Sequence, residues 1–138
     1  MINNKFYKHF FILFFLAIVL GCSKPDAGQL IDKALEAENR TPSYMLRDKY
    51  RHPKETLLFF GLNPEQSIVE ITPGYGWYAE ILAPLIRNKG QYYYTSLKLH
   101  EKINPYFVKV EKAFKEKMEK NPDIYDQLRW VHFDPKQP

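Results

Sequence analysis

Apolar and polar residues alternate along the chain at spacings that predict both helices and strands. Apolar residues three or four positions apart indicate helices that pack one face, and short β-branched or aromatic runs between turn residues indicate strands. The expected order is a helix over 29–39, a short helix from Pro53 to just before Gly61, a strand over Ser67–Ile71, a helix over Tyr78–Ile86, a strand over Gln91–Ser96, a helix over Asn104–Lys120 and a strand over Gln127–Phe133.

This order of elements predicts an α/β fold. Strands that alternate with helices form a parallel sheet with right-handed crossovers. The two helices that precede the first strand form an N-terminal helical cap. Pro84 lies inside the third predicted helix, which we therefore expect to bend or restart there.

The first 22 residues have the pattern of an exported lipoprotein. Lys5 and Lys8 precede an uncharged apolar run of 11 residues, Phe10 to Leu20. This length suits a signal peptide, whereas a membrane-spanning helix needs about 20 apolar residues. Val19-Leu20-Gly21-Cys22 resembles the bacterial lipobox, in which cleavage follows the glycine and the cysteine is lipidated. We therefore expect residues 1–21 to be a lipoprotein signal peptide.

Cys22 is the only cysteine of the chain, which excludes an intramolecular disulfide and a cysteine-based metal site. The alternative to lipidation is an uncleaved membrane anchor with an unmodified thiol. Ser23 follows the cysteine, and by resemblance to lipoprotein sorting rules this favours the outer membrane. We expect a lipid-anchored protein on the periplasmic face of a bacterial envelope, with the membrane as a partner through Cys22.

Removal of residues 1–21 changes the length and the charge balance. Of the 138 residues 117 remain, enough for one domain. Residues 22–40 form a tether and the N-terminal helix, with the polar tether at 23–28, and residues 41–138 form the rest of the domain. Lys5 and Lys8 are lost, so the net charge falls from +4 to +2. This small excess gives no reason to expect nucleic acid as a partner.

The segment Ser67–Leu82 places a strand, a glycine-bearing turn and a helix in succession. Glu70 lies near the carboxyl end of the strand, and Gly74 and Gly76 bring bare backbone to the start of the helix. Free N–H groups there are suited to a carboxylate or phosphate. Open α/β sheets bind ligands at this place, so the pattern indicates a nucleotide or nucleoside site. On spacing alone, a Pro-Gly-x-Gly turn is structural as often as functional.

The turn differs from two well-known phosphate-binding motifs. Thr72 and Tyr78 stand where a dinucleotide fingerprint has glycines, and no Gly-Lys-Ser/Thr follows, as a phosphate loop would need.

Two stretches resemble a known family. Glu70-x-x-Pro73-Gly74-x-Gly76 is similar to motif I of class I S-adenosylmethionine-dependent methyltransferases. The stretches Arg47–Gly61 and Val69–Pro84 resemble the N-terminal half of a predicted methyltransferase family of exported bacterial proteins, over roughly residues 40–134. The resemblance implies a Rossmann-like class I methyltransferase fold and S-adenosylmethionine as the cofactor. It also implies that the methionine and ribose parts are lined by Glu70, Thr72, Gly74, Tyr75 and Gly76.

Two further positions follow from the same resemblance. The family usually has an acidic residue for the ribose hydroxyls at the end of the second strand, where this chain has Thr95-Ser96, which can hydrogen-bond but carries no charge. Ser96 is therefore a candidate for cofactor binding. Asp134 follows the third strand, where such folds often contact adenine, and a plain Asp-Pro turn explains it equally well.

No catalytic or metal-binding residue can be assigned. Arg51 and His52 suggest a catalytic role, but the simpler interpretation is that, with Arg47, they orient the cap by hydrogen bonds. His100 and His132 lack metal-ligand spacing. The tyrosines at 92–94 can stack on a base but more simply pack against helices.

The predicted sheet has three strands, whereas the fold that the chain resembles has seven. We therefore expect a βαβαβ N-terminal half, an incomplete form of the methyltransferase domain. The expected function is methyl transfer to an acceptor that the sequence does not identify. The alternative is a non-catalytic envelope lipoprotein that reuses the fold to bind a partner.

Overall fold

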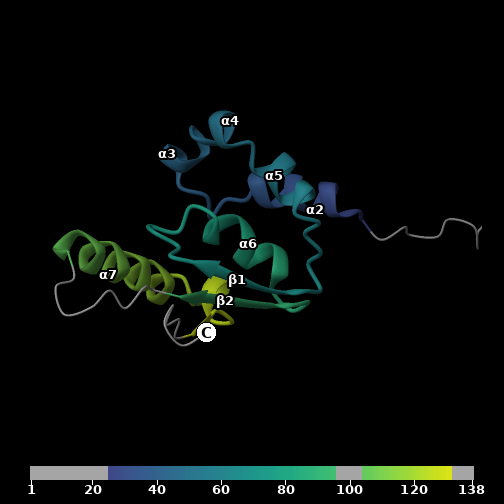
Figure 1. Cartoon of the computed structure of the whole chain (residues 1–138). Coiled ribbons are helices and arrows are strands. Elements are labelled where there is room, and N and C mark those ends of the chain that lie inside the picture. Colours follow the sequence, from purple (N-terminus) through teal and green to yellow (C-terminus); the bar gives the residue numbers. More distant parts are fainter. Residues whose placement is uncertain (1–24, 96–103, 132–138) are drawn as a thin grey trace, which may run out of the picture.

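A computed structural model describes residues 25–95 and 104–131, and within them it is a mixed α/β fold (Figure 1). The sheet is parallel and three-stranded, as predicted, and its strand order is β1-β2-β3. Its strands are β1 (Ser67–Ile71), β2 (Gln91–Thr95) and β3 (Arg129–Trp130). The helices of the described residues are α2 (Ala27–Leu35), α3 (Pro42–Met45), α4 (Asp48–Arg51), α5 (Pro53–Phe59), α6 (Ala79–Ile86), α7 (Pro105–Lys120) and α8 (Pro122–Tyr125).

The register of the sheet is set where β1 and β2 begin. Ser67 lies beside Gln91, and the pairing continues to Ile71 beside Thr95. Gly90 precedes β2, and its backbone lies against that of Gln66, the residue before β1. A Cβ at position 90 would lie 2.0 Å from the Gln66 carbonyl oxygen. Only a glycine leaves room for that approach.

Within the described residues the third strand is shorter than expected, and the last two predicted positions, His132 and Phe133, lie outside those residues. Pairing between β2 and β3 covers Arg129 and Trp130, and the Val131 N–H extends it to the Tyr94 carbonyl at 2.9 Å. The strand prediction was wrong for Gln127 and Leu128, because the Leu128 N–H bonds the Tyr125 carbonyl at 3.0 Å and closes a turn after α8.

The first helix also differs from its predicted bounds. It begins at Ala27 because Asp26 caps it: the Asp26 carboxylate accepts the Gln29 N–H at 2.8 Å, and the Gln29 side chain accepts the Asp26 N–H at 3.1 Å. Ala27 and Gly28 therefore belong to the helix and not to the tether. The helix ends at Leu35 rather than at residue 39, which leaves Asn39 and Arg40 free to make tertiary contacts.

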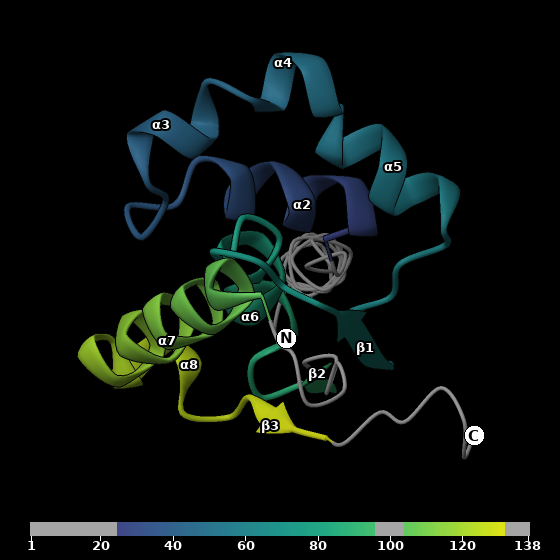
Figure 2. The same ribbon diagram turned by 60° about the vertical axis from the view of Figure 1, so that its left-hand side comes forward.

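The helical cap lies against α6, which in turn covers the sheet. Figure 2 shows α3, α4 and α5 as an arc over α2, with α6 between α2 and the strands. Ile31 and Ala34 of α2 are buried, and so are Ile81, Leu82 and Leu85 of α6. In the part of the chain that the structure describes, no helix is long and apolar enough to span a membrane.

Pro84 gives the cap an attachment point on α6. Proline has no N–H, so the carbonyl four residues earlier, that of Glu80, has no helical donor. The Asn39 side-chain amide donates to this carbonyl at 2.9 Å. The helix is therefore continuous from Ala79 to Ile86, and its vacant acceptor is filled by the cap.

A buried ionic cluster ties the cap to α6 and α7. The Glu80 side chain is buried and accepts the Thr41 N–H at 2.9 Å and the Thr41 hydroxyl at 2.5 Å. Lys117 of α7 donates to the same carboxylate at 2.6 Å. Arg40 lies beside Glu80, with 3.7 Å between Nε and Oε2, and forms a two-pronged ion pair with Asp48 at 2.9 and 3.0 Å. These contacts fix how the cap meets the rest of the fold.

Candidate functional site

The glycine turn after β1 has an unusual backbone. Thr72, Gly74 and Gly76 all have positive φ, at 55°, 59° and 87°. Thr72 is the strained member, since left-handed geometry is uncommon for a β-branched residue. Its hydroxyl donates to the Ile71 carbonyl at 2.6 Å, and its N–H donates to the Thr95 carbonyl at 2.9 Å. The strand thus ends in a turn that leads the chain over the end of β2.

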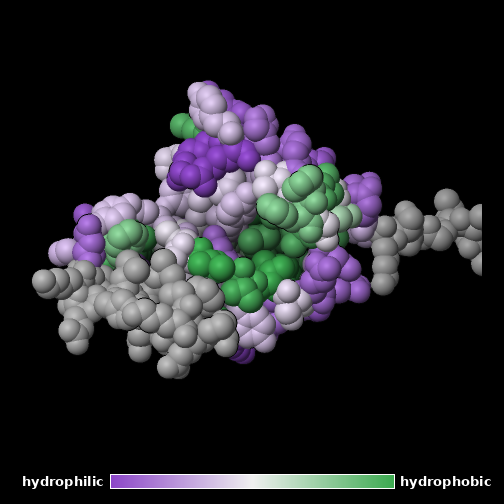
Figure 3. Space-filling model, in the orientation of Figure 1, coloured by the Kyte–Doolittle hydropathy of each residue, from purple (hydrophilic) through white to green (hydrophobic). Residues whose placement is uncertain are grey.

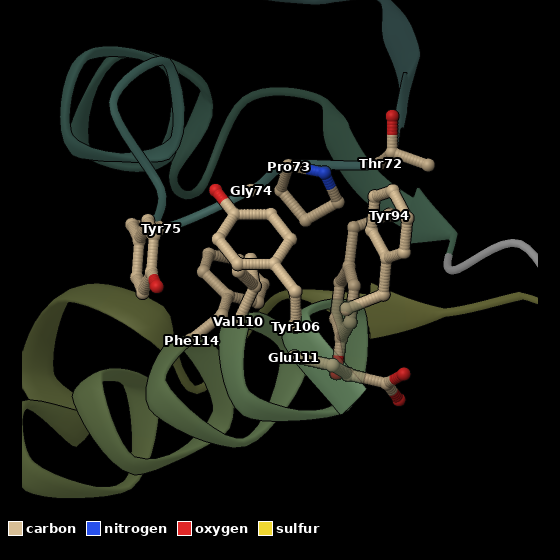
Figure 4. Close-up of a pocket in the computed structure, with 10 residues that line it drawn as sticks. Thr72, Pro73, Gly74, Tyr75, Tyr94, Tyr106, Val110, Glu111 and Phe114 are labelled. Atoms are coloured by element: carbon tan, nitrogen blue, oxygen red, sulfur yellow. The ribbon is translucent and has the colours of Figure 1, made fainter. Parts of the chain in front are cut away.

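A pocket of about 220 Å³ lies beneath this turn, at the carboxyl end of the strands. Figure 4 shows side chains of α7 rising toward the turn from below, with Tyr75 and Tyr94 on either side. The lining is mostly apolar and rich in aromatic rings. It consists of Thr72, Pro73, Gly74 and Tyr75 of the turn, Tyr94 of β2, and Tyr106, Phe107, Val110, Glu111 and Phe114 of α7.

The rings of the pocket differ in exposure. Tyr94 and Phe114 are buried and meet edge to face, with centroids 5.2 Å apart. Tyr75, Tyr106 and Phe107 are partly exposed and form the accessible wall. Burial raises the pKa of the Tyr94 phenol, which therefore stays protonated at neutral pH. Flat apolar rings with free faces are suited to stack on a planar ligand.

The charge in the lining is confined to the rim. Glu111 carries the only carboxylate among the described lining residues, and this carboxylate points away from the rings in Figure 4. It pairs with Lys115 at 2.7 Å. None of the described residues that line the pocket is a lysine, arginine or histidine. The described part of the lining therefore offers no cation to a phosphate.

The predicted residues of the turn are thus divided between lining and support. Thr72, Gly74 and Tyr75 line the pocket, whereas Gly76 is buried behind it. A Cβ on Gly76 would lie 2.9 Å from the Phe114 ring, so this glycine lets α7 pack against the turn.

Glu70 lies on another part of the molecule. Its side chain enters a groove between α5, β1 and α6, and its carboxylate accepts a hydrogen bond from the Tyr92 hydroxyl. Burial raises the pKa of Glu70 to about 7, against the opposing effect of that hydrogen bond. Glu70 is therefore not one of the described residues that line the pocket beneath the turn.

Some of the amides that the turn pattern suggested as free are already bonded at the start of α6. The Gly76 N–H bonds the Pro73 carbonyl at 2.9 Å, and the Glu80 N–H bonds the Gly76 carbonyl at 3.1 Å. The Ile81 N–H is taken by Tyr78, again at 2.9 Å. These three donors are used inside the turn and the first helical turn, so they are not available to a carboxylate or phosphate.

The cap holds the turn through Tyr44, a residue that sequence reasoning did not select. The Tyr44 hydroxyl donates to the Tyr75 carbonyl at 3.2 Å, and the Trp77 indole donates to the Tyr44 carbonyl at 3.0 Å. Arg51 stacks over the Trp77 ring, 4.7 Å from its centroid. Arg51 therefore contacts the turn region by a cation–π interaction, while the hydrogen bonds that join the cap to α6 and the turn involve Asn39, Thr41 and Tyr44.

The remaining predicted residues cannot be placed. Ser96, Asp134 and Cys22 lie outside the described residues, as does the expected signal peptide. Within residues 25–95 and 104–131, no group of three or more His, Cys, Asp or Glu side chains is arranged to hold a metal ion.

The wall contributed by α7 is the main part of the site that the sequence did not reveal. Phe107, Val110 and Phe114 were recognisable as the apolar face of an amphipathic helix, but only the fold brings that face beneath the turn. Comparison of the chain with protein-family models, with curated proteins and with solved structures finds no match in any of the three.

Proposed function

We propose that this chain binds S-adenosylmethionine in the pocket beneath the Thr72–Gly76 turn and descends from class I methyltransferases. The observation that carries the proposal is the aromatic pocket at the carboxyl end of β1, where parallel α/β sheets bind ligands. The turn that covers it holds the Pro73-Gly74-x-Gly76 sequence that resembles methyltransferase motif I. The sheet order β1-β2-β3 and the layers of helices fit the N-terminal half of that fold.

The chemistry of the pocket favours this cofactor over a nucleotide. The lining residues that the structure describes have rings that can stack on adenine, and none of them is a basic residue that would pair with a phosphate. S-adenosylmethionine has no phosphate and carries a positive sulfonium. Aromatic faces attract such a cation. Among the described lining residues, ATP and dinucleotides have no partner for their negative charges.

The size of the pocket indicates how much of the cofactor it holds. Its 220 Å³ is below the range of about 300–1,000 Å³ that is usual for a pocket enclosing a whole ligand. We therefore assign it the nucleoside part. No described residue in the lining is placed as a general base, so the methyl acceptor is not assigned.

Titration calorimetry on the full chain in mild detergent tests the proposal. S-adenosylmethionine is expected to bind and ATP to bind at least tenfold more weakly. Substitution of Phe107 by Ala removes an exposed ring of the wall, and the affinity is expected to fall at least tenfold. Lys112→Ala, on the exposed side of the same helix, serves as the matched control. No heat at millimolar S-adenosylmethionine, or equal binding of ATP, refutes the assignment.

The same sample distinguishes the two functional classes. Transfer of a labelled methyl group to a component of an envelope extract supports an enzyme. Binding of the cofactor without transfer supports the alternative, a non-catalytic envelope protein that retains the fold for binding.

We also propose that Cys22 carries the lipid anchor and that the protein belongs to the bacterial envelope. The support is the sequence alone: the apolar run, the lipobox-like Val19–Cys22 and the absence of other cysteines. Metabolic labelling with a radioactive fatty acid is expected to mark the wild-type chain and not the Cys22→Ser variant. Equal labelling of both would refute lipidation at this residue.

A further inference from the structure

The two main walls of the pocket beneath the turn come from separate parts of the chain. The turn supplies Thr72 to Tyr75, and α7 supplies side chains between Tyr106 and Phe114. Apolar packing joins these walls, because Phe114 is buried, meets Tyr94 edge to face and lies against Gly76. Apolar contacts are non-directional, so they press the walls together without fixing where α7 lies along its own axis.

Lys117 makes a directional contact between α7 and another helix. It follows Val110 by seven residues and Phe114 by three, so it lies on the same face of α7 as these two buried side chains. Its ammonium donates to the Glu80 carboxylate of α6 at 2.6 Å. The exposed Lys112, by contrast, pairs with a glutamate of α7 itself. Lys117 therefore ties the buried face of α7 to α6.

The carboxylate that Lys117 contacts is itself held in place. The Glu80 side chain is only 1% exposed, and it accepts hydrogen bonds from both the N–H and the hydroxyl of Thr41. A hydrogen bond between two charged groups is short and directional. The last turns of α7 are therefore held at a fixed point on α6.

The Tyr44 side chain contacts both walls of the pocket. The Lys117 ammonium lies 4.6 Å from the centroid of the Tyr44 ring, and the Tyr44 hydroxyl donates to the Tyr75 carbonyl of the turn at 3.2 Å. Burial raises the pKa of the Tyr44 phenol, so the hydroxyl keeps the proton that it donates. Figure 3 shows the outer side of α3 and α4 as mostly hydrophilic, whereas Tyr44 makes these contacts on the inner side of the cap.

We propose that Lys117 is a positioning residue: through Glu80 and Tyr44 it holds α7 at the distance from the turn at which a planar ligand fits between the two walls. The identity of the ligand rests on the proposed function, whereas the position of α7 does not. Lys117 is not among the described residues that line the pocket, so it acts through the walls and not on the ligand. A site with pre-positioned walls binds more tightly, since less of the binding energy is used to order them.

Calorimetry with S-adenosylmethionine on the full chain measures the effect on binding. Lys117→Met keeps the length of the side chain and removes its charge. It is expected to weaken binding about fivefold, because a partly exposed ion pair shifts an equilibrium by up to about that factor. Lys117→Arg keeps the cation and is expected to restore most of the affinity. Lys112→Met removes an exposed cation of the same helix and is the matched control, expected to bind like the wild type.

Urea unfolding separates positioning from general stabilisation. The midpoint of Lys117→Met is expected to stay close to that of Lys112→Met, since the Lys117 ammonium is partly exposed and water can solvate the group in its place. Equal affinity of these two variants would overturn the proposal, and so would a Lys117→Arg variant that binds as weakly as Lys117→Met. A loss of affinity accompanied by a large fall in the midpoint would indicate a purely structural role and would also contradict it.

Hydrogen exchange followed by mass spectrometry gives a readout that needs no ligand. In Lys117→Met the amides of α7 are expected to exchange several-fold faster than in the wild type, while those of α2 keep nearly the same rate, because the lost contact is one of α7. Unchanged exchange in α7 would overturn the proposal whether or not the cofactor binds. A wild-type chain that gives no heat with S-adenosylmethionine refutes the proposed ligand, and faster exchange of α7 would then still support its positioning by Lys117.

Discussion

Loss of the Glu80 carboxylate is expected to destabilise the protein more than any loss of a surface charge. Glu80→Ala removes the acceptor of both Thr41 hydrogen bonds and leaves the Arg40 side chain, which is fully buried, with Asp48 as its remaining ionic partner. Hydrogen bonds to a charged group contribute about 1.5–3 kcal/mol each. Breaking a buried ion pair by removing one partner costs about 3–5 kcal/mol.

We therefore expect Glu80→Ala to lower the free energy of unfolding by about 3–5 kcal/mol. This is a large part of the roughly 5–15 kcal/mol that stabilises a domain of this size. Lys117 is partly exposed, so water can solvate its ammonium group in the variant, and the lost pairing with Lys117 adds little to the decrease in the free energy of unfolding. Glu80→Gln keeps the shape and one acceptor, and is expected to cost less than Glu80→Ala.

Urea unfolding followed by tryptophan fluorescence measures this effect, since Trp77 is buried beside the cap. Glu116→Gln provides the control, because its pairing with Lys112 at 3.9 Å is exposed and is expected to contribute under about 1 kcal/mol. A cost below about 1 kcal/mol for Glu80→Ala would refute the view that this cluster attaches the cap.

Three other substitutions have definite expected outcomes. Because the pKa of Glu70 rises from 4.5 to about 7 on folding, its protonated form is favoured, and its contribution to stability is full below pH 4.5 and disappears as the pH rises through 7. The wild-type protein is therefore expected to lose about 3 kcal/mol of its free energy of unfolding between these pH values. The Glu70→Gln variant is expected not to show this loss, so its melting temperature should depend less on pH. Gly90→Ala places a methyl group against the Gln66 carbonyl and is expected to cost more than about 3 kcal/mol in urea unfolding. Tyr44→Phe removes the donor to the Tyr75 carbonyl and is expected to lower the free energy of unfolding by about 1 kcal/mol. It is also expected to weaken S-adenosylmethionine binding several-fold in calorimetry. Unchanged affinity would argue against a role of the cap in holding the turn.

The sequence predicted the order of the main elements because their signals are local. The apolar spacing of α7, the glycine after α5 and the β-branched run of β1 each depend on neighbours in the chain. The short helices α3, α4 and α8 were missed, since four residues carry no periodicity to detect. Pro42 and Pro122 begin α3 and α8, and Asp48 at the start of α4 forms an ion pair with Arg40.

The candidate site was predicted only where it coincides with the turn. Thr72, Gly74 and Tyr75 were selected from the motif, and they line the pocket. Glu70 was selected from the same motif, but the alternation of side chains along β1 turns it toward Tyr92. The aromatic wall comes from a helix more than thirty residues later, and no local pattern states which element that helix will face.

The double attachment at residue 80 has a consequence for how the molecule opens. The main-chain carbonyl of Glu80 accepts a hydrogen bond from Asn39, and its carboxylate accepts one from Thr41. One residue of α6 is therefore attached to the cap through two independent groups. Detachment of the cap removes both of these partners at once and leaves Lys117 as the donor to the carboxylate, which penalises partial opening. Amide protons of α2 and α6 should therefore exchange with solvent together, at a rate set by complete unfolding, rather than through separate fraying of the cap.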